Sequence, residues 1–174
     1  PDVTLSYSSD RGNGLLGVGW DISVPMVSCS TRFGVPNYSS CARYELSGEP
    51  LVGPDSSGNR YHTFNESFSK ILRNPGGDWE ITSTDGTRML FGGHSYSRLA
   101  GPGGGTAEWY LDAIVDVFGN GVNYTWIAET TSEPGTKYLS KIEYGLGSRE
   151  VRFVYESRND TIEDSRGGVH RIRA

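Results

Sequence analysis

This sequence of 174 residues lacks several features that mark other classes of protein. No apolar run approaches the ~20 residues that a helix needs to cross a bilayer, which argues against a membrane-spanning helix. No long stretch places apolar side chains at the helical spacing of about 3.6 residues. The formal net charge is -5 and the basic residues are scattered, which argues against a nucleic-acid-binding protein. The chain opens at Pro1 without a methionine, and we interpret it as part of a longer protein.

Glycine and aromatic residues, by contrast, are abundant. The chain has 24 glycines, 10 tyrosines, 6 phenylalanines and 4 tryptophans, but only 2 methionines. Aromatic residues favour strands and glycine favours tight turns. Short alternating runs are separated by turn signals, such as Asp85-Gly86 between the runs 79–82 and 88–91. The sequence therefore predicts an all-β fold built from antiparallel meander and hairpin sheets.

The opening segment combines an alternating run with a connector rich in glycine. Alternation puts Val3, Leu5 and Tyr7 on one face of a strand. Trp20 follows the connector, and we expect it to fill the junction. The connector also matches a dinucleotide-binding pattern, but residues 20–25 alternate instead of opening a helix, which favours a β connection. The glycines of this predicted structural motif are Gly12, Gly14, Gly17 and Gly19.

Only two cysteines are present, Cys29 and Cys41, with eleven residues between them. A loop of that length closes readily with a disulfide, which stabilises by ~3 kcal/mol in the loop-entropy model. The pair favours a disulfide in an exported protein, with two reduced thiols as the alternative.

A second structural motif lies in the later part of the chain. Asp116 precedes a turn at Gly119-Asn120, and the strand that follows carries Tyr124. We expect Asp116 to cap this turn through bonds from its carboxylate to the backbone. A similar unit recurs weakly at 139–144, and such units need neighbours to cover their apolar faces.

No group of residues forms a coherent catalytic or metal site, so we predict no enzyme activity, cofactor or metal. The three histidines, His62, His94 and His170, lie far apart without a local carboxylate partner. Asp112 and Asp116 fall on one face of a strand, where a glycosidase pair is conceivable, but alternation puts this face opposite the apolar core. Six aromatic residues suit cross-strand pairing or, as the alternative, a sugar-stacking platform. These residues are Tyr110, Tyr124, Trp126, Tyr138, Tyr144 and Tyr155.

The run from Leu5 to Pro25 resembles the start of the SpvB-type N-terminal domain, which occurs in the B component of tripartite Tc toxins and in virulence-plasmid B proteins. Further similar segments follow in the same order along the chain. They lie at 44–52, 60–64, 68–71, 79–86, 109–124, 138–144 and 151–158. The second half also looks like tyrosine-aspartate (YD/Rhs) repeats. The resemblance therefore implies an SpvB-type region at 1–108 that continues into a YD/Rhs-like region at 109–174, with the cysteine loop as a departure.

The resemblance implies a secreted, non-catalytic structural module in a β shell that encloses or presents a toxin. Its partners would be other shell segments, a toxin cargo and a translocation component. In some members a separate C-terminal ADP-ribosyltransferase domain performs the catalysis, and this chain has no segment that resembles it. The alternative is an extracellular β domain that binds carbohydrate or a cell surface, as an adhesin does.

Overall fold

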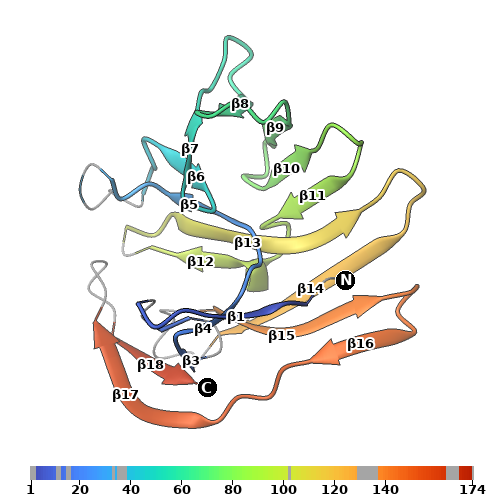
Figure 1. The fold of residues 1–174 in the computed structure, drawn as a ribbon. Helices are drawn as coiled ribbons and strands as arrows, with labels where there is room; N and C mark the ends of the chain where they lie inside the picture. The colour runs from blue at the N-terminus through green and yellow to red at the C-terminus, as the bar shows by residue number, and fades with distance from the viewer. Residues whose placement is uncertain are drawn as a thin grey trace.

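The computed structural model describes residues 3–10, 13–14, 17–32, 34, 39–101, 103–128, 137–163 and 169–173 (Figure 1). These residues form strands and one short 3-10 helix, η1 (Ser95–Ser97). The strands are β1 (Leu5–Tyr7), β2 (Asn13–Gly14), β3 (Gly17–Val18), β4 (Trp20–Ile22), β5 (Met26–Cys29), β6 (Tyr44–Leu46), β7 (Glu49–Val52), β8 (Arg60–Thr63), β9 (Lys70–Arg73), β10 (Trp79–Thr82), β11 (Arg88–Phe91), β12 (Arg98–Ala100), β13 (Thr106–Val115), β14 (Gly121–Ala128), β15 (Lys137–Tyr144), β16 (Arg149–Arg152), β17 (Ser157–Glu163) and β18 (Val169–Arg173). The predicted all-β class is confirmed.

Most strands belong to one large antiparallel sheet. Its order is β11-β10-β9-β8-β7-β6-β5-β13-β14-β15-β16, and β12 also pairs with β13. From β5 to β11 each strand pairs with the next in the chain, because short turns can join antiparallel neighbours directly. One such turn is at Gly86, where φ is +84° between β10 and β11. The predicted meander is therefore confirmed.

Strand β13 closes the meander into a ring of eight described strands. Its residues 108–110 pair with β5, and its residues 111–115 pair with β11. Because both ends of the meander pair with one long strand, neither is left as a free edge there. Strands β14, β15 and β16 extend the sheet beyond the ring on the other side of β13 (Figure 1).

Four aromatic side chains from different strands meet in the core of the ring. Tyr44, Tyr61, Trp79 and Trp109 come from β6, β8, β10 and β13, and all are buried. Their contacts are edge-to-face, with ring centroids 4.9–6.0 Å apart. This arrangement suits the charge distribution of aromatic rings and fills the space that a ring of strands encloses.

Two segments differ from what the sequence indicates. The glycine-rich tract at 101–105 suggests a disordered loop, but the N–H of Gly101 donates to the carbonyl of Gly105 at 2.8 Å, while residue 102 lies outside the described residues. The last predicted strand covers 149–156, whereas β16 ends at Arg152 and the separate pair β17–β18 follows. Pairing with a neighbour, which alternation does not encode, decides both outcomes.

A tyrosine beyond β16 is tied to the preceding strand. The hydroxyl of Tyr155 donates to the carbonyl of Leu139 at 2.7 Å, and its ring lies 5.2 Å from that of Tyr138. The pKa of Tyr155 is raised to about 12, mainly by burial and to a smaller extent by the neighbouring Tyr138. The phenol therefore stays protonated in the folded chain at a pH where an unfolded tyrosine ionises.

We expect the free energy of unfolding to fall as the pH rises from about 10 to about 12. Between these pH values the folded chain retains a proton that the unfolded chain releases. The contribution of Tyr155 to the free energy of unfolding is therefore fully present below about pH 10 and is lost as the pH rises further. The loss is on the order of 2 kcal/mol, after allowance for the partial exposure of Tyr155. Urea unfolding across this range measures it. The Tyr155→Phe variant should show a smaller alkaline loss, and an equal loss would contradict the assignment.

Candidate functional site

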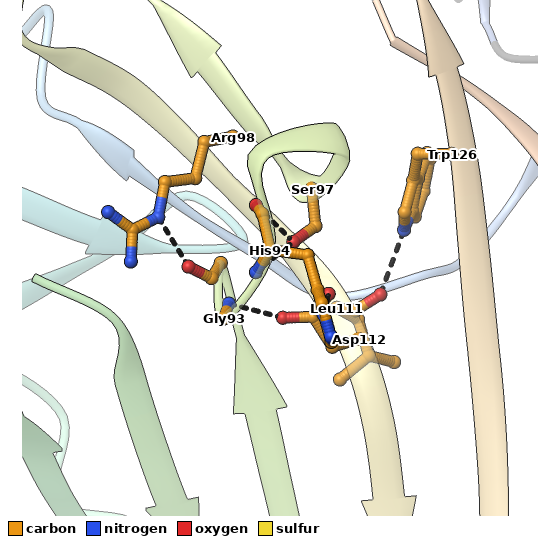
Figure 2. Close-up of polar contacts among 8 residues, drawn as sticks. Gly93, His94, Ser97, Arg98, Leu111, Asp112 and Trp126 are labelled. Carbon is orange, nitrogen blue, oxygen red and sulfur yellow. Dashed lines mark hydrogen bonds and ion pairs between the residues drawn. The ribbon is translucent and has the colours of Figure 1, made fainter. Parts of the chain in front are cut away.

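A histidine and an aspartate from separate elements meet beside the 3-10 helix. The turn after β11 carries His94, and its ring Nδ1 lies 3.1 Å from Oδ1 of Asp112 on β13 (Figure 2). The other carboxylate oxygen of Asp112 accepts a hydrogen bond from the N–H of Gly93. Asp112 is 6% exposed, whereas the His94 side chain is 59% exposed. The pair thus joins a buried carboxylate to a ring that reaches solvent.

Polar contacts hold the turn that presents His94. The hydroxyl of Ser97 donates to the carbonyl of His94 at 3.0 Å and accepts from its N–H at 3.3 Å. The Arg98 guanidinium donates through Nε to the carbonyl of Gly92 and through Nη2 to that of Gly76, the latter at 3.0 Å. Because these bonds satisfy the backbone of a tight turn, the position of His94 is set by the turn itself.

The pair lines a recess of about 480 Å³ between the turn and strands β11, β13, β14 and β15. The rings of His94 and Tyr96 stack there, with centroids 4.8 Å apart and planes 8° from parallel. The pKa of Tyr96 is raised, mainly by burial and to a smaller extent by the negative charges of Asp112 and Glu143. Glu143 is itself paired with Lys141 at 2.9 Å. The recess therefore offers a stacking surface beside hydrogen-bonding groups.

What a contact between histidine and aspartate can do depends on the partner of the second ring nitrogen. A histidine oriented by aspartate acts as a base when its second nitrogen meets a nucleophile or a substrate proton. Within the described part of the chain, no serine, threonine or cysteine side chain is hydrogen-bonded to the His94 ring. The described residues also contain no group of three side chains suited to a metal ion and no helix long and apolar enough to cross a membrane.

The two aspartates of β13 and its following turn are not brought together. The Asp116 carboxylate accepts from the N–H groups of Phe118 at 2.9 Å and Asn120 at 2.8 Å, and from the Asn120 side chain at 2.7 Å. These bonds, led by the Asn120 side chain, lower the pKa of Asp116. Gly119 takes a φ of +84° in the same turn. Asp112 was expected opposite the core, yet it is buried because the turn carrying His94 covers its face.

The glycine-rich opening forms two small hairpins. Gly14 pairs with Gly17 between β2 and β3, while Gly12 lies outside the described residues. Gly19 has a φ of +78°, and a Cβ there would lie 2.6 Å from the Tyr7 ring. Trp20 does not fill a buried junction, since it is 46% exposed with its ring 5.2 Å from that of Tyr7. The reason is that β1 and β4 pair with each other, outside the main sheet.

The two cysteines are joined. Cys29, at the end of β5, and Cys41 form a disulfide with their Cα atoms 5.6 Å apart. Cys29 is buried in the core cluster, and Cys41 packs against it. The bridge therefore ties Cys41 to the strand that pairs with β13.

The aromatic residues of the second half pack inside the sheet. Tyr110, Tyr124, Trp126 and Tyr138 are buried, and the Trp126 indole N–H donates to the carbonyl of Leu111 at 2.8 Å. The ring of Tyr110 lies 4.7 Å from that of Trp126. These four side chains therefore stabilise the sheet and do not offer a platform for sugars.

The contact between His94 and Asp112 is the feature that the sequence did not reveal. The two residues are 18 positions apart, and the pairing of β11 with β13 brings them together. The local signal was Gly92-Gly93 directly before His94, which marks a turn but not its partner.

Comparison with known proteins gives matches along most of the chain. Residues 1–74 match the family described as Salmonella virulence plasmid 65kDa B protein. The chain is 29% identical, over an alignment 188 positions long, to the mono(ADP-ribosyl)transferase SpvB of Salmonella choleraesuis and of Salmonella enteritidis. The alignment covers 83% of this chain and 32% of each relative, so the chain spans about a third of their length.

Solved structures show the same fold. The N-terminal domain of the effector protein SpvB from Salmonella typhimurium strain LT2 matches with a TM-score of 0.71 and 26% identity, over 89% of this chain and 62% of that one. The Photorhabdus luminescens Tc holotoxin pore matches with a TM-score of 0.72 and 29% identity, over 83% of this chain and 8% of that one. The predicted resemblance is confirmed: the chain is similar to the SpvB N-terminal domain and to part of Tc toxin components.

Proposed function

We propose that this chain is a non-catalytic structural module of a secreted toxin-complex protein, where it forms part of a β shell that encloses or presents a toxin. The observation that carries the proposal is the fold, which matches both an isolated SpvB domain and Tc toxin assemblies. The curated relatives are named as ADP-ribosyltransferases. We propose that their catalytic part lies outside the segment that this chain matches.

The closed ring of strands β5–β11 and β13 and its extension, strands β14–β16, have different roles in the proposed shell. Aromatic side chains fill the core of the ring, so the ring is a solid block and a cargo would lie outside it. The extension ends at β16, which pairs among the described strands with β15 alone. An unpaired strand edge accepts another strand readily. We propose that a neighbouring segment of the shell pairs there.

The outward groups of β16 follow from its register. The N–H of Phe153 donates to the carbonyl of Ser140 at 2.9 Å, and Arg152 lies opposite Lys141. Hydrogen-bonded and non-hydrogen-bonded pairs alternate along an antiparallel ladder. The backbone N–H of Arg152 therefore points away from β15, toward the free edge.

The division into an SpvB-type region at 1–108 and a YD/Rhs-like region at 109–174 also stays a proposal. The neighbouring Tc toxin structures support repeats of this kind after the SpvB-type part. The boundary falls inside β13, whose residues pair with strands of both regions. The two regions therefore share a sheet, as a continuous shell requires.

Removing the outward N–H of β16 tests the proposal. In the full-length parent protein, Arg152→Pro should expose the cargo polypeptide to protease, because proline cannot donate to an adjoining strand. Arg152→Ala is the matched control, since both variants lose the contact with Glu150 at 2.7 Å. The cargo should stay protected in Arg152→Ala, with both variants folded by circular dichroism.

Equal protection of the cargo in both variants would count against a shell role for this edge. One observation favours the alternative of a carbohydrate-binding domain, namely the stacked His94 and Tyr96 beside the polar recess. Reproducible glycan binding that is lost in Tyr96→Ala, with no effect of Arg152→Pro on cargo protection, would favour that alternative.

A further inference from the structure

An arginine at the end of β9 reaches into the aromatic core of the ring. The guanidinium carbon of Arg73 lies 5.2 Å from the ring centroid of Tyr44, 5.8 Å from that of Trp79 and 6.0 Å from that of Trp109. Cross-strand pairing places Arg73 directly opposite Trp79. Three aromatic rings thus surround one positive charge, an arrangement that attracts a cation to ring faces.

Aromatic rings do not satisfy the hydrogen-bonding groups of this arginine. The N–H donors of a guanidinium lie in its plane and point at acceptors along its edge. The Nε of Arg73 is buried without an acceptor among the described residues, and so are the indole nitrogens of Trp79 and Trp109. A buried donor without a partner costs ~1–3 kcal/mol. Three such donors in one cluster indicate that an acceptor belongs there.

The charge of Arg73 also has no counter-ion in the described part of the chain. Its nearest carboxylate in sequence, Asp78, accepts a hydrogen bond from the Asn74 side chain at 2.6 Å and forms no ion pair with Arg73. Arg73 is partly buried, and a charge that loses part of its contact with water without gaining a partner is unfavourable. An anion that reaches the guanidinium would neutralise this charge.

A cavity of about 390 Å³ gives access to Arg73 from outside the ring. Its walls come from the turn between β7 and β8, the end of β9 and the turn between β9 and β10, and the lining residues are Gly58, Asn59, Arg73, Asn74, Pro75 and Gly77. A second cation is close, since Nη1 of Arg98 lies 3.8 Å from the position that a Cβ on Gly77 would take. The cavity thus has one arginine in its wall, a second arginine near Gly77, and room for a small group.

We propose that this cavity binds a carboxylate, held by the edge of the Arg73 guanidinium. A carboxylate is planar and accepts two parallel hydrogen bonds from a guanidinium, so it matches this donor edge. It could belong to a small molecule or to an acidic side chain of an adjoining segment. The proposal does not depend on the shell function, because it rests on the donors and charges of this chain alone.

Nuclear magnetic resonance of the 174-residue chain, labelled with nitrogen-15, tests the proposal. The Nε–H signal of Arg73 and the indole signals of Trp79 and Trp109 are followed during titration with acetate, with glutarate and with a peptide of glutamates. Chloride at matched ionic strength is the control. The Arg73 signal should shift and saturate with a carboxylate but not with chloride.

Two variants with the same charge change sharpen the result. Arg73→Gln should weaken carboxylate binding by about tenfold or more, whereas Lys70→Gln, on the exposed side of the same strand, should leave it within about twofold. Saturation by acetate alone indicates a free ligand, and saturation by the peptide alone indicates an acidic segment; either supports the site. The absence of a saturable Arg73 shift, or one that chloride reproduces, overturns the proposal even if Arg73→Gln fails to fold.

Discussion

Replacing Gly92 by alanine should lower the free energy of unfolding by about 3 kcal/mol. Two causes add up: alanine disfavours the left-handed backbone conformation at this position, and its Cβ would crowd the Trp109 side chain. Gly92 has a φ of +65°, and a Cβ there would lie 2.3 Å from Cδ1 of Trp109 and 3.0 Å from its Cγ. Trp109 is 2% exposed and packs against other rings, so it has little room to move. Urea unfolding followed by tryptophan fluorescence measures the loss.

Gly121 provides the control for this substitution. Its φ lies outside the left-handed region and a Cβ there would meet no atom within 4 Å, so Gly121→Ala should change stability by less than about 0.5 kcal/mol. In a Trp109→Leu background, Gly92→Ala should cost less than in the wild type, because the crowding is relieved. An equal cost in both backgrounds would show that the indole ring is not responsible.

Opening the disulfide between Cys29 and Cys41 should also cost about 3 kcal/mol, the value for a closed loop of this length. Removing the bridge frees the unfolded chain and loosens the loop that precedes β6. Unfolding of the wild type with and without a reducing agent measures the effect. The double variant Cys29→Ala, Cys41→Ala should match the reduced protein and be insensitive to the agent, whereas an unchanged midpoint on reduction would refute a stabilising role.

Local patterns in the sequence were sufficient to predict the strands of the meander and many of the turns between them. Asp85-Gly86 indicated the hairpin of β10 and β11, which forms with Gly86 at a φ of +84°. Hydrophobic alternation placed the other strands of the meander because each pairs with its neighbour in the chain. The same patterns suggested disorder at 101–105, because glycine is typical of both flexible loops and tight turns. The hydrogen bonds between Gly101 and Gly105 and between Gly104 and Gly101 show which of the two forms here.

Contacts between distant segments could not be predicted in the same way. The pairing of β13 with both β5 and β11 depends on the curvature of the seven strands from β5 to β11, which no single segment encodes. Asp112 is an example. Alternation predicted that it lies on the outer face of the sheet, but the turn at His94 covers that face and buries the side chain. The recess beside His94 exists only after β13 has joined β11, so its residues carry no local signature.

The late position of β13 in the chain has a consequence for how the protein is made. The strands β5 and β11 are synthesised before β13. Each of them then has an unpaired edge, because the residues of β13 have not yet left the ribosome. Contacts so remote in sequence slow folding, and exposed edges favour association with other chains during the delay. Chaperone binding to the nascent chain should therefore be greatest between the emergence of β11 and that of β13.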